Sequence, residues 1–171
     1  MGPILVEAFR YNRWANLHLL DVCAGLTDDQ LHLSASGTYG TIAATLLHLV
    51  AAEQRYLRRF GRGDPRINER DAFPGVMRLR DHAERSGDEL IAVAGRINPE
   101  EAIEESRDGG GIYRLELGVV LLQAMHHGND HRTHVCTILG HHGIEYGQMD
   151  VWGYGLATGA LAPVTSPTSR A

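Results

Sequence analysis

Lysine is absent from the 171-residue sequence, because all sixteen basic residues are arginine. This absence excludes a Schiff-base lysine, a lysine general base and the lysine of a phosphate-binding loop. Cysteine is scarce, and Cys23 and Cys136 alone cannot form a zinc–thiolate cluster. Two thiols in a chain that shows no secretion signal predict free, reduced cysteines.

Long apolar runs and a surplus of positive charge are missing as well. No segment approaches the roughly 20 apolar residues of a membrane span. Residues 1–10 acquire charge too early to form the apolar stretch of a signal peptide. The net charge of −5 and the pI of about 6.0 give no electrostatic footprint for nucleic acid. We therefore expect a cytoplasmic protein that binds neither membranes nor nucleic acid.

Four segments carry apolar residues at helical spacing, with glycine or proline near their ends. They cover about residues 3–24, 41–60, 73–97 and 115–139. Long helices joined by moderate loops predict an all-α fold, and a four-helix bundle is the expected architecture. Thr38 or Thr41 is suited to capping the second segment, Gly61 and Gly63 to closing it, and Gly140 to ending the fourth.

The remaining segments are expected to be loops. The triple glycine at 109–111 disfavours a helix and predicts a turn or a short hairpin. The last residues are rich in alanine, threonine, proline and serine, a composition typical of a poorly ordered tail. We expect one domain over residues 1–156 and a tail over 157–171.

Histidine is concentrated in one short stretch, where six of the ten histidines lie between residues 126 and 142. His127, His131 and His134 fall within about 60° of one another on a helix. The core-facing stripe of this segment comprises Val120, Ala124, His127, His131, Val135 and Ile138. Residues four apart have Cβ atoms about 5–6 Å apart, so His127 and His131 can reach one divalent metal ion.

A third ligand is expected from another helix, and His48 is the best candidate because apolar residues flank it in the second segment. Packed helices approach within about 8–10 Å, so His48 can complete the site. Three imidazoles and an open position are typical of a catalytic ion. Zinc or nickel is the expected metal, with iron or manganese as alternatives. His134 is left open as a fourth ligand, an accessory base or a packing residue.

The other candidate residues are predicted to have structural roles or to lie at the surface. Glu53 is predicted to be a solvated or arginine-paired carboxylate, with a supporting or general-base role as the alternative. Trp152 and Tyr154 are predicted to pack, although they could cover the mouth of the site. Cys136 points about 180° away from His127 on a helix, which excludes a nucleophilic pair between them. The remaining histidines are predicted to lie at the surface, namely His18, His32, His82, His126, His141 and His142.

Four motifs together resemble the DinB/YfiT-like superfamily of metalloenzymes. The stretch Leu47–Leu57 resembles the second helix of that family, and His126–Arg132 resembles its His-x-x-x-His-Arg signature. The sequences Tyr11-Asn-Arg-Trp-Ala-Asn16 and Asp150-Val-Trp-Gly-Tyr154 are also similar to family motifs. The resemblance covers about residues 11–154. The family commonly continues its signature as His-Arg-Gly-Gln, whereas this chain has His134 at the last position.

The resemblance implies a four-helix bundle with an up-down-down-up connection, for which the loop 61–72 is long enough. It implies that the three metal-binding histidines are His48, His127 and His131. It also implies a homodimer, since members often self-associate. Characterised relatives include the mycothiol-dependent maleylpyruvate isomerase and bacillithiol transferases, which use or transfer a low-molecular-weight thiol.

Three functional hypotheses follow. The first is a metal-dependent enzyme with an open three-histidine site, acting on a small-molecule substrate by thiol S-transfer or hydrolysis, with His134 as its accessory base. The second is a non-catalytic metal-binding or stress-response helical module, in which the ion stabilises the bundle. The third is a metal-free dimerisation protein whose histidines only pack.

Overall fold

The computed structural model describes residues 3–62, 67–107 and 109–164. Four long helices dominate it: α1 (Pro3–Cys23), α3 (Ile42–Arg58), α4 (Val76–Ala94) and α5 (Leu117–His141). Two short helices, α2 (Asp28–Leu31) and α6 (Val151–Thr158), and two strands, β1 (Ala102–Arg107) and β2 (Gly111–Glu116), complete the described elements. The four expected helical segments are confirmed, each with bounds within a few residues of those predicted.

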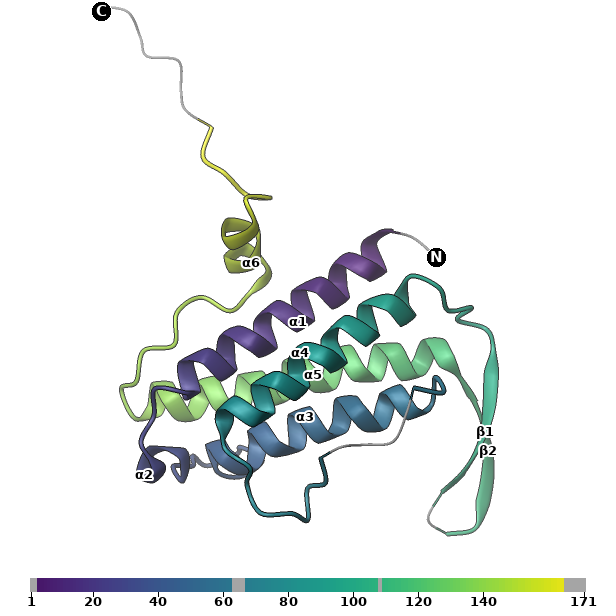
Figure 1. Ribbon diagram of the computed structural model, residues 1–171, viewed down its shortest axis with the longest axis horizontal. Helices are drawn as coiled ribbons and strands as arrows, with labels where there is room; N and C mark the ends of the chain where they lie inside the picture. The colour runs from purple at the N-terminus through teal and green to yellow at the C-terminus, as the bar shows by residue number, and fades with distance from the viewer. Residues whose placement is uncertain (1–2, 63–66, 108, 165–171) are drawn as a thin grey trace, which may run out of the picture.

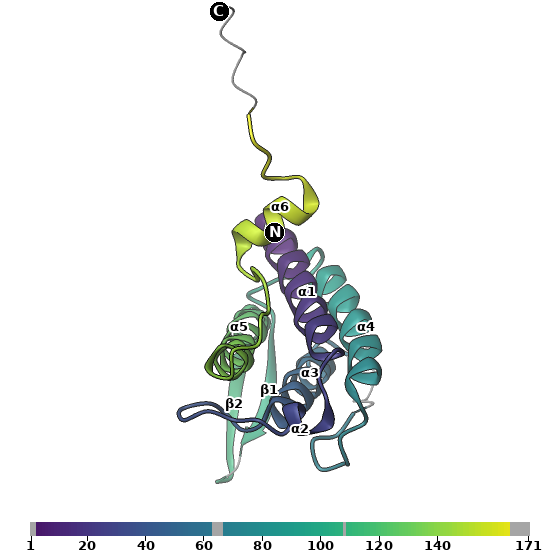
Figure 2. The ribbon, with the colours of Figure 1, turned by 90° about the vertical axis from the view of Figure 1, so that its left-hand side faces the viewer.

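The four long helices lie side by side (Figures 1 and 2). Helix α1 packs against α4 and α5, and α3 packs against the same two helices, so α1 and α3 occupy opposite corners. The colours of Figure 1 show that α1 and α5 run in one direction, and that α3 and α4 run in the other. This arrangement brings α3 and α5 into contact, and these helices carry the predicted ligands.

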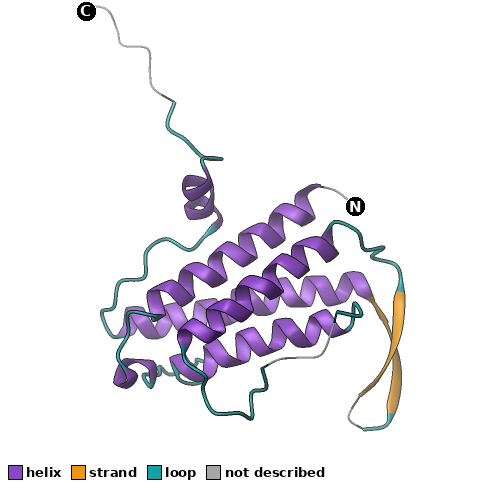
Figure 3. Cartoon of the chain, in the orientation of Figure 1, coloured by secondary structure: helices purple, strands orange, loops and turns teal. Residues whose placement is uncertain are grey.

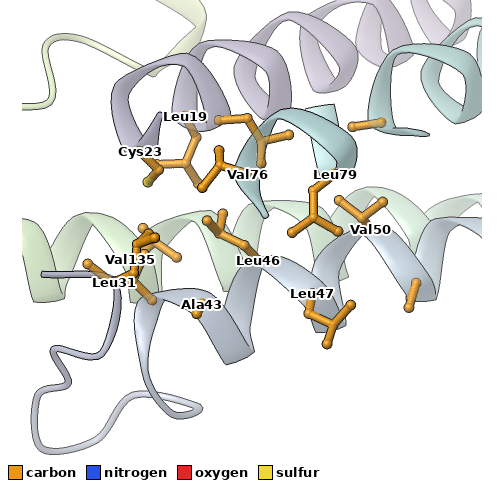
Figure 4. Close-up of a cluster of buried hydrophobic side chains, with 14 of the residues drawn as sticks. Leu19, Cys23, Leu31, Ala43, Leu46, Leu47, Val50, Val76, Leu79 and Val135 are labelled. Carbon is orange, nitrogen blue, oxygen red and sulfur yellow. The ribbon is translucent and has the colours of Figure 1, made fainter. Parts of the chain in front are cut away.

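Two clusters of buried apolar side chains form the core. One includes Leu19, Leu46, Leu79 and Val135, and Figure 4 shows this cluster between the long helices. The other includes Phe9, Leu57, Leu90 and Leu121. On each long helix, buried polar residues separate the two clusters, and these polar residues are Asn12, Asn16, Glu53, Ser86 and Arg132. The core therefore contains a polar layer between two apolar ones.

The strands require a correction of the all-α prediction. Strands β1 and β2 pair antiparallel, with Ala102 opposite Glu116 and Arg107 opposite Gly111, and they form a hairpin between α4 and α5 (Figure 3). Gly109 and Gly110 adopt φ of +103° and +85°, which only glycine adopts readily. The hairpin alternative for the triple glycine is confirmed. Strand β2 continues to residue 116, so α5 begins two residues later than predicted.

Local capping signals explain two helices that periodicity does not predict. Thr27 and Gln30 form a reciprocal capping box at the start of α2. Asp150 accepts a hydrogen bond from Gly153 N at the start of α6, and Gly159 ends it at φ +76°. The predicted boundary at residue 156 therefore lies inside α6. The last part of the predicted tail, 165–171, lies outside the described residues, as does Gly63.

The other capping expectations concern α3 and α5. Thr41 caps α3 by accepting a hydrogen bond from Ala44 N, and Gly61 follows that helix at φ +69°. Gly140 does not end α5, because the helix continues to His141 and Gly143 is the first residue beyond it with positive φ. Among the helices within the described ranges, none is long and apolar enough to cross a membrane.

Candidate metal centre

The structure brings His48, His127 and His131 together. His48 lies at the middle of α3, and the other two lie one turn apart on the facing side of α5. One ring nitrogen of each residue lies within 4.8 Å of the other two. The three ring centroids are 4.3 to 4.8 Å apart. The i, i+4 spacing on one helix and a single histidine on the other therefore produce a compact three-nitrogen cluster.

The closest contact in the cluster joins two ring nitrogens of the same kind. His127 Nε2 and His48 Nε2 lie 2.9 Å apart. Without a cation, one of these nitrogens must carry a proton and donate it to the other. With a cation between the rings, both nitrogens can present their lone pairs to it. The cluster therefore has the donor type and the proximity that a divalent metal ion requires.

Burial keeps two of these imidazoles neutral. Burial, together with the nearby His131 and His48 rings, lowers the pKa of His127 to about 3. Burial, assisted by His48 and His134, lowers the pKa of His131 to about 4. The Nδ1 atoms of both residues are buried and find no hydrogen-bond partner among the described residues. Because metals bind the neutral imidazole, these side chains are ready to coordinate at neutral pH.

His48 is oriented by groups that the sequence pattern did not reveal. Its Nδ1 lies 2.9 Å from Glu69 Oε2 and 3.1 Å from the Tyr39 hydroxyl. Arg55 forms an ion pair with Glu69. Burial raises the pKa of Glu69, but the hydrogen bonds from His48 and Arg55 outweigh this effect and lower it overall. Glu69 is thus a carboxylate that accepts the Nδ1 proton of His48 and directs its Nε2 toward His127.

His134 lies beside the cluster and not within it. Among the described residues, two groups have donor atoms close enough to hold a metal ion: His48 with His127 and His131, and Asp130 with His131 and His134. The His131 and His134 ring centroids are 5.3 Å apart. His134 therefore belongs to a second group that shares His131.

The back of α5 is anchored by a buried polar network. Arg132 donates to Asn12 Oδ1 at 2.7 Å and to Asn16 Oδ1 at 2.6 Å. Both asparagines donate in turn to Glu53 Oε1, and Ser86 donates to its Oε2. The two asparagine amides thus connect the Arg132 guanidinium with the Glu53 carboxyl group across the core.

Glu53 corrects the sequence interpretation. It is 1% exposed, so it is not solvated, and its hydrogen bonds go to uncharged side chains and not directly to an arginine. Burial raises the pKa of Glu53, against the hydrogen bonds from Ser86 and Asn12. Gly128 makes room for this network, because a Cβ atom there would lie 2.5 Å from Asn12 Oδ1. A helix-weakening glycine between His127 and His131 is therefore required by packing.

Comparison with known proteins identifies the family of this chain and supports its fold. The sequence matches the DinB family over residues 1–161. The chain belongs to the DinB family. The crystal structure of a DinB-like protein from Bacillus cereus ATCC 10987 is similar, with a TM-score of 0.60 and 15% identity, covering 84% of this chain and 94% of that one. At this identity the likeness shows a shared fold. No curated protein matches this sequence.

The other candidates in this DinB-family chain lie away from the cluster. Tyr154 packs on Tyr11 and Trp14 of α1 and donates to Glu7, as the packing prediction requires. Trp152 is exposed, so the packing prediction was wrong for this residue. His32, His126, His141 and His142 are exposed, as predicted, and His18 is half-buried against Trp14. His82 is buried and contacts Gln54, so its surface prediction was wrong.

The two cysteines of the DinB-family chain are free, as expected. Burial raises the pKa of Cys23 to about 12 and that of Cys136 to about 11. A thiol acts as a nucleophile in its ionised form, which these side chains do not reach at neutral pH. Any thiol chemistry at this site therefore requires a thiol from outside the chain.

We predict that Glu69→Gln weakens metal affinity without removing the site. The amide keeps the size of the side chain but accepts the His48 proton less strongly, because its charge is lost. Replacing such a partner of a metal-binding histidine costs roughly 10- to 100-fold in affinity. Competition with a chelator measures this change. An unchanged affinity would contradict the orienting role, and Glu89→Gln, an exposed site on α4, is the matched control.

We predict that the metal-free protein loses stability as the pH falls from about 6.5 toward 4. In this window the unfolded chain protonates residues 127 and 131, whereas the folded protein keeps them neutral because their pKa values are about 3 and 4. Protons therefore favour the unfolded chain, and the free energy of unfolding decreases. Urea denaturation at about pH 7 and 5 measures the decrease, which should be smaller in His127→Gln/His131→Gln. An equal decrease in both proteins would disprove this prediction.

Proposed function

We propose that this DinB-family protein is a metal-dependent enzyme whose ion is held by His48, His127 and His131. The observation that best supports this proposal is the distance of 2.9 Å between His127 Nε2 and His48 Nε2, next to the buried imidazole of His131. Zinc or nickel fits a donor set of neutral nitrogens, with iron or manganese as alternatives. A four-helix bundle with an up-down-down-up connection is the proposed architecture, supported by the helix directions in Figure 1.

The proposed reaction is thiol S-transfer or hydrolysis on a small-molecule substrate. The ion would supply a nucleophile at neutral pH by lowering the pKa of a bound water or thiol. Glu69 holds the Nδ1 proton of His48 and thereby fixes the ring. Tyr39 is half exposed and stacks on His48 with its ring centroid 4.3 Å away, which places it where a substrate would approach.

A catalytic ion keeps one coordination position free for water or substrate, whereas a structural ion has protein ligands at every position. His134 is the obvious fourth ligand of a closed site, but its donor atom groups with Asp130 and His131. This grouping favours the open arrangement over the non-catalytic, stress-response module. The proposal of His134 as an accessory base follows from its place beside the cluster. The proposal of a homodimer follows from the family resemblance.

The test combines metal content with an activity panel. Purified protein should hold one equivalent of zinc or nickel and should turn over at least one pair from a panel of low-molecular-weight thiols and electrophiles, or of hydrolysable esters and amides. Metal removal should abolish that turnover, and metal return should restore it. Metal-loaded protein that is inert across the panel, with a fourth protein ligand in its coordination sphere, would support the structural alternative.

A further inference from the structure

A second group of metal-binding side chains lies on α5 beside the first. One donor atom each from Asp130, His131 and His134 lies within 4.8 Å of the other two. The donor atoms are close because of helix geometry: Asp130 and His134 are four residues apart, and His131 and His134 are three apart. Side chains at both spacings are neighbours on a helix surface. A carboxylate and two imidazoles form a donor set that zinc and nickel accept.

Two atoms of this group lack the partners that buried polar atoms normally have. The Nδ1 atoms of His131 and His134 are both buried, and no hydrogen bond reaches them from the described ranges. Asp130 places a carboxylate oxygen within 4.8 Å of both imidazole donors of this group, and carboxylate oxygens bind divalent cations. A cation is thus attracted to this side of α5.

The two groups differ in exposure and charge. Asp130 is exposed and His134 is half-buried, whereas His131, which both groups share, is only 7% exposed. The first group consists of imidazoles alone, of which His48 and His127 are half-buried, and the second includes the exposed carboxylate of Asp130. A cation from solvent therefore meets the exposed carboxylate of the second group first.

We propose that Asp130, His131 and His134 form an outer cation site, through which a divalent ion passes to the inner site of His48, His127 and His131. The proposal rests on the proposed function, since the inner site is the destination of the ion. His131 stays bound during the transfer, while the bonds to Asp130 and His134 break and bonds to His48 and His127 form. The proton that His127 Nε2 donates to His48 Nε2 in the metal-free cluster moves to His127 Nδ1, which has no hydrogen-bond partner within the described ranges, so that both Nε2 atoms offer a lone pair to the ion. No electron is exchanged. Because an imidazole that keeps its N–H has one lone pair, the shared His131 binds one ion at a time.

The first experiment measures the rate of metal uptake. Metal-free protein is mixed with cobalt(II) alone in a stopped-flow instrument, and the visible absorption of the bound ion is followed. Asp130→Asn/His134→Gln should still bind one equivalent at equilibrium, but association should slow by about tenfold or more. His126→Gln is the matched control, because His126 is exposed on the same helix and outside both groups, and it should bind at the wild-type rate.

The second experiment isolates the outer site. His48→Ala/His127→Ala removes two inner ligands and should still bind one cobalt(II), more weakly than wild type. Adding His134→Gln to this variant should abolish the remaining binding. Circular dichroism verifies that each variant is folded.

The outcomes separate the two proposals. Equal uptake rates in Asp130→Asn/His134→Gln and His126→Gln would overturn the outer site while leaving the inner site intact. Absence of cobalt binding by His48→Ala/His127→Ala would overturn it too, and two equivalents in wild type would refute transfer through a shared ligand. If the wild type binds no cobalt at all, the proposed metal centre itself fails.

Discussion

Replacing His131 with alanine is expected to abolish stoichiometric metal binding and the stabilisation that metal brings. His131 is the ring that completes the cluster around the facing His48 and His127 nitrogens, and it also belongs to the outer group. Its loss leaves two imidazoles, which hold a divalent ion far less tightly than three. A ligand that binds only the folded state stabilises it by about 2.7 kcal/mol when present at about 100 times its Kd.

Thermal unfolding with and without added zinc measures this effect. The wild-type melting temperature should rise with zinc, whereas that of His131→Ala should not change. His126→Ala serves as the control on the same helix, and it should keep the full shift because His126 is exposed and lies outside both groups. An equal zinc-dependent shift in His131→Ala would show that the ion binds elsewhere.

Replacing Arg132 with methionine is expected to lower the free energy of unfolding by about 3–5 kcal/mol, because each buried polar group that is left without its hydrogen-bond partner costs roughly 1–3 kcal/mol. Arg132 is 3% exposed and Glu53 is 1% exposed. The substitution leaves the Glu53 carboxylate buried without its compensating charge and leaves both asparagine carbonyls without their donor. Methionine fills much of the same volume, so the loss reflects the missing polar partners.

Urea denaturation of three variants tests this assignment. Arg80→Met should cost at most about 1 kcal/mol, because the Arg80–Asp21 pair lies at the surface. Adding Glu53→Gln to Arg132→Met should recover part of the lost stability by removing the uncompensated charge. Strictly additive effects of these two substitutions would contradict an energetic connection through Asn12 and Asn16.

The histidine cluster was predictable because helix periodicity determines which side chains share a face. His127 and His131 lie on the apolar stripe of one helix, and apolar neighbours flank His48 on another. Such a pattern indicates which faces meet in the core. The DinB fold followed from four motifs in the right order, and the family assignment confirms it.

Groups in loops and in the polar layer escaped prediction for physical reasons. Tyr39 and Glu69 lie outside the long helices, where no periodicity reports their direction, and only the folded chain brings them to His48. Glu53 was predicted to be solvated or paired with an arginine, but the nearby Arg55 pairs with Glu69. Glu53 is buried because its partners come from α1 and α4. Signals for α2 and α6 were present in Thr27, Gln30, Asp150 and Gly159 as capping residues.

Neighbouring residues His131 and Arg132 lie about 100° apart around α5, so that His131 joins the histidine cluster while Arg132 joins the polar layer of the core. The two asparagines that accept from Arg132 also donate to Glu53 of α3, so this network links α5 to the helix that carries His48. The interhelical spacing is thus set by folding, before an ion arrives. Metal uptake should therefore need little reorganisation of the backbone, and metal-free and metal-loaded crystals should superpose closely along α1, α3 and α5.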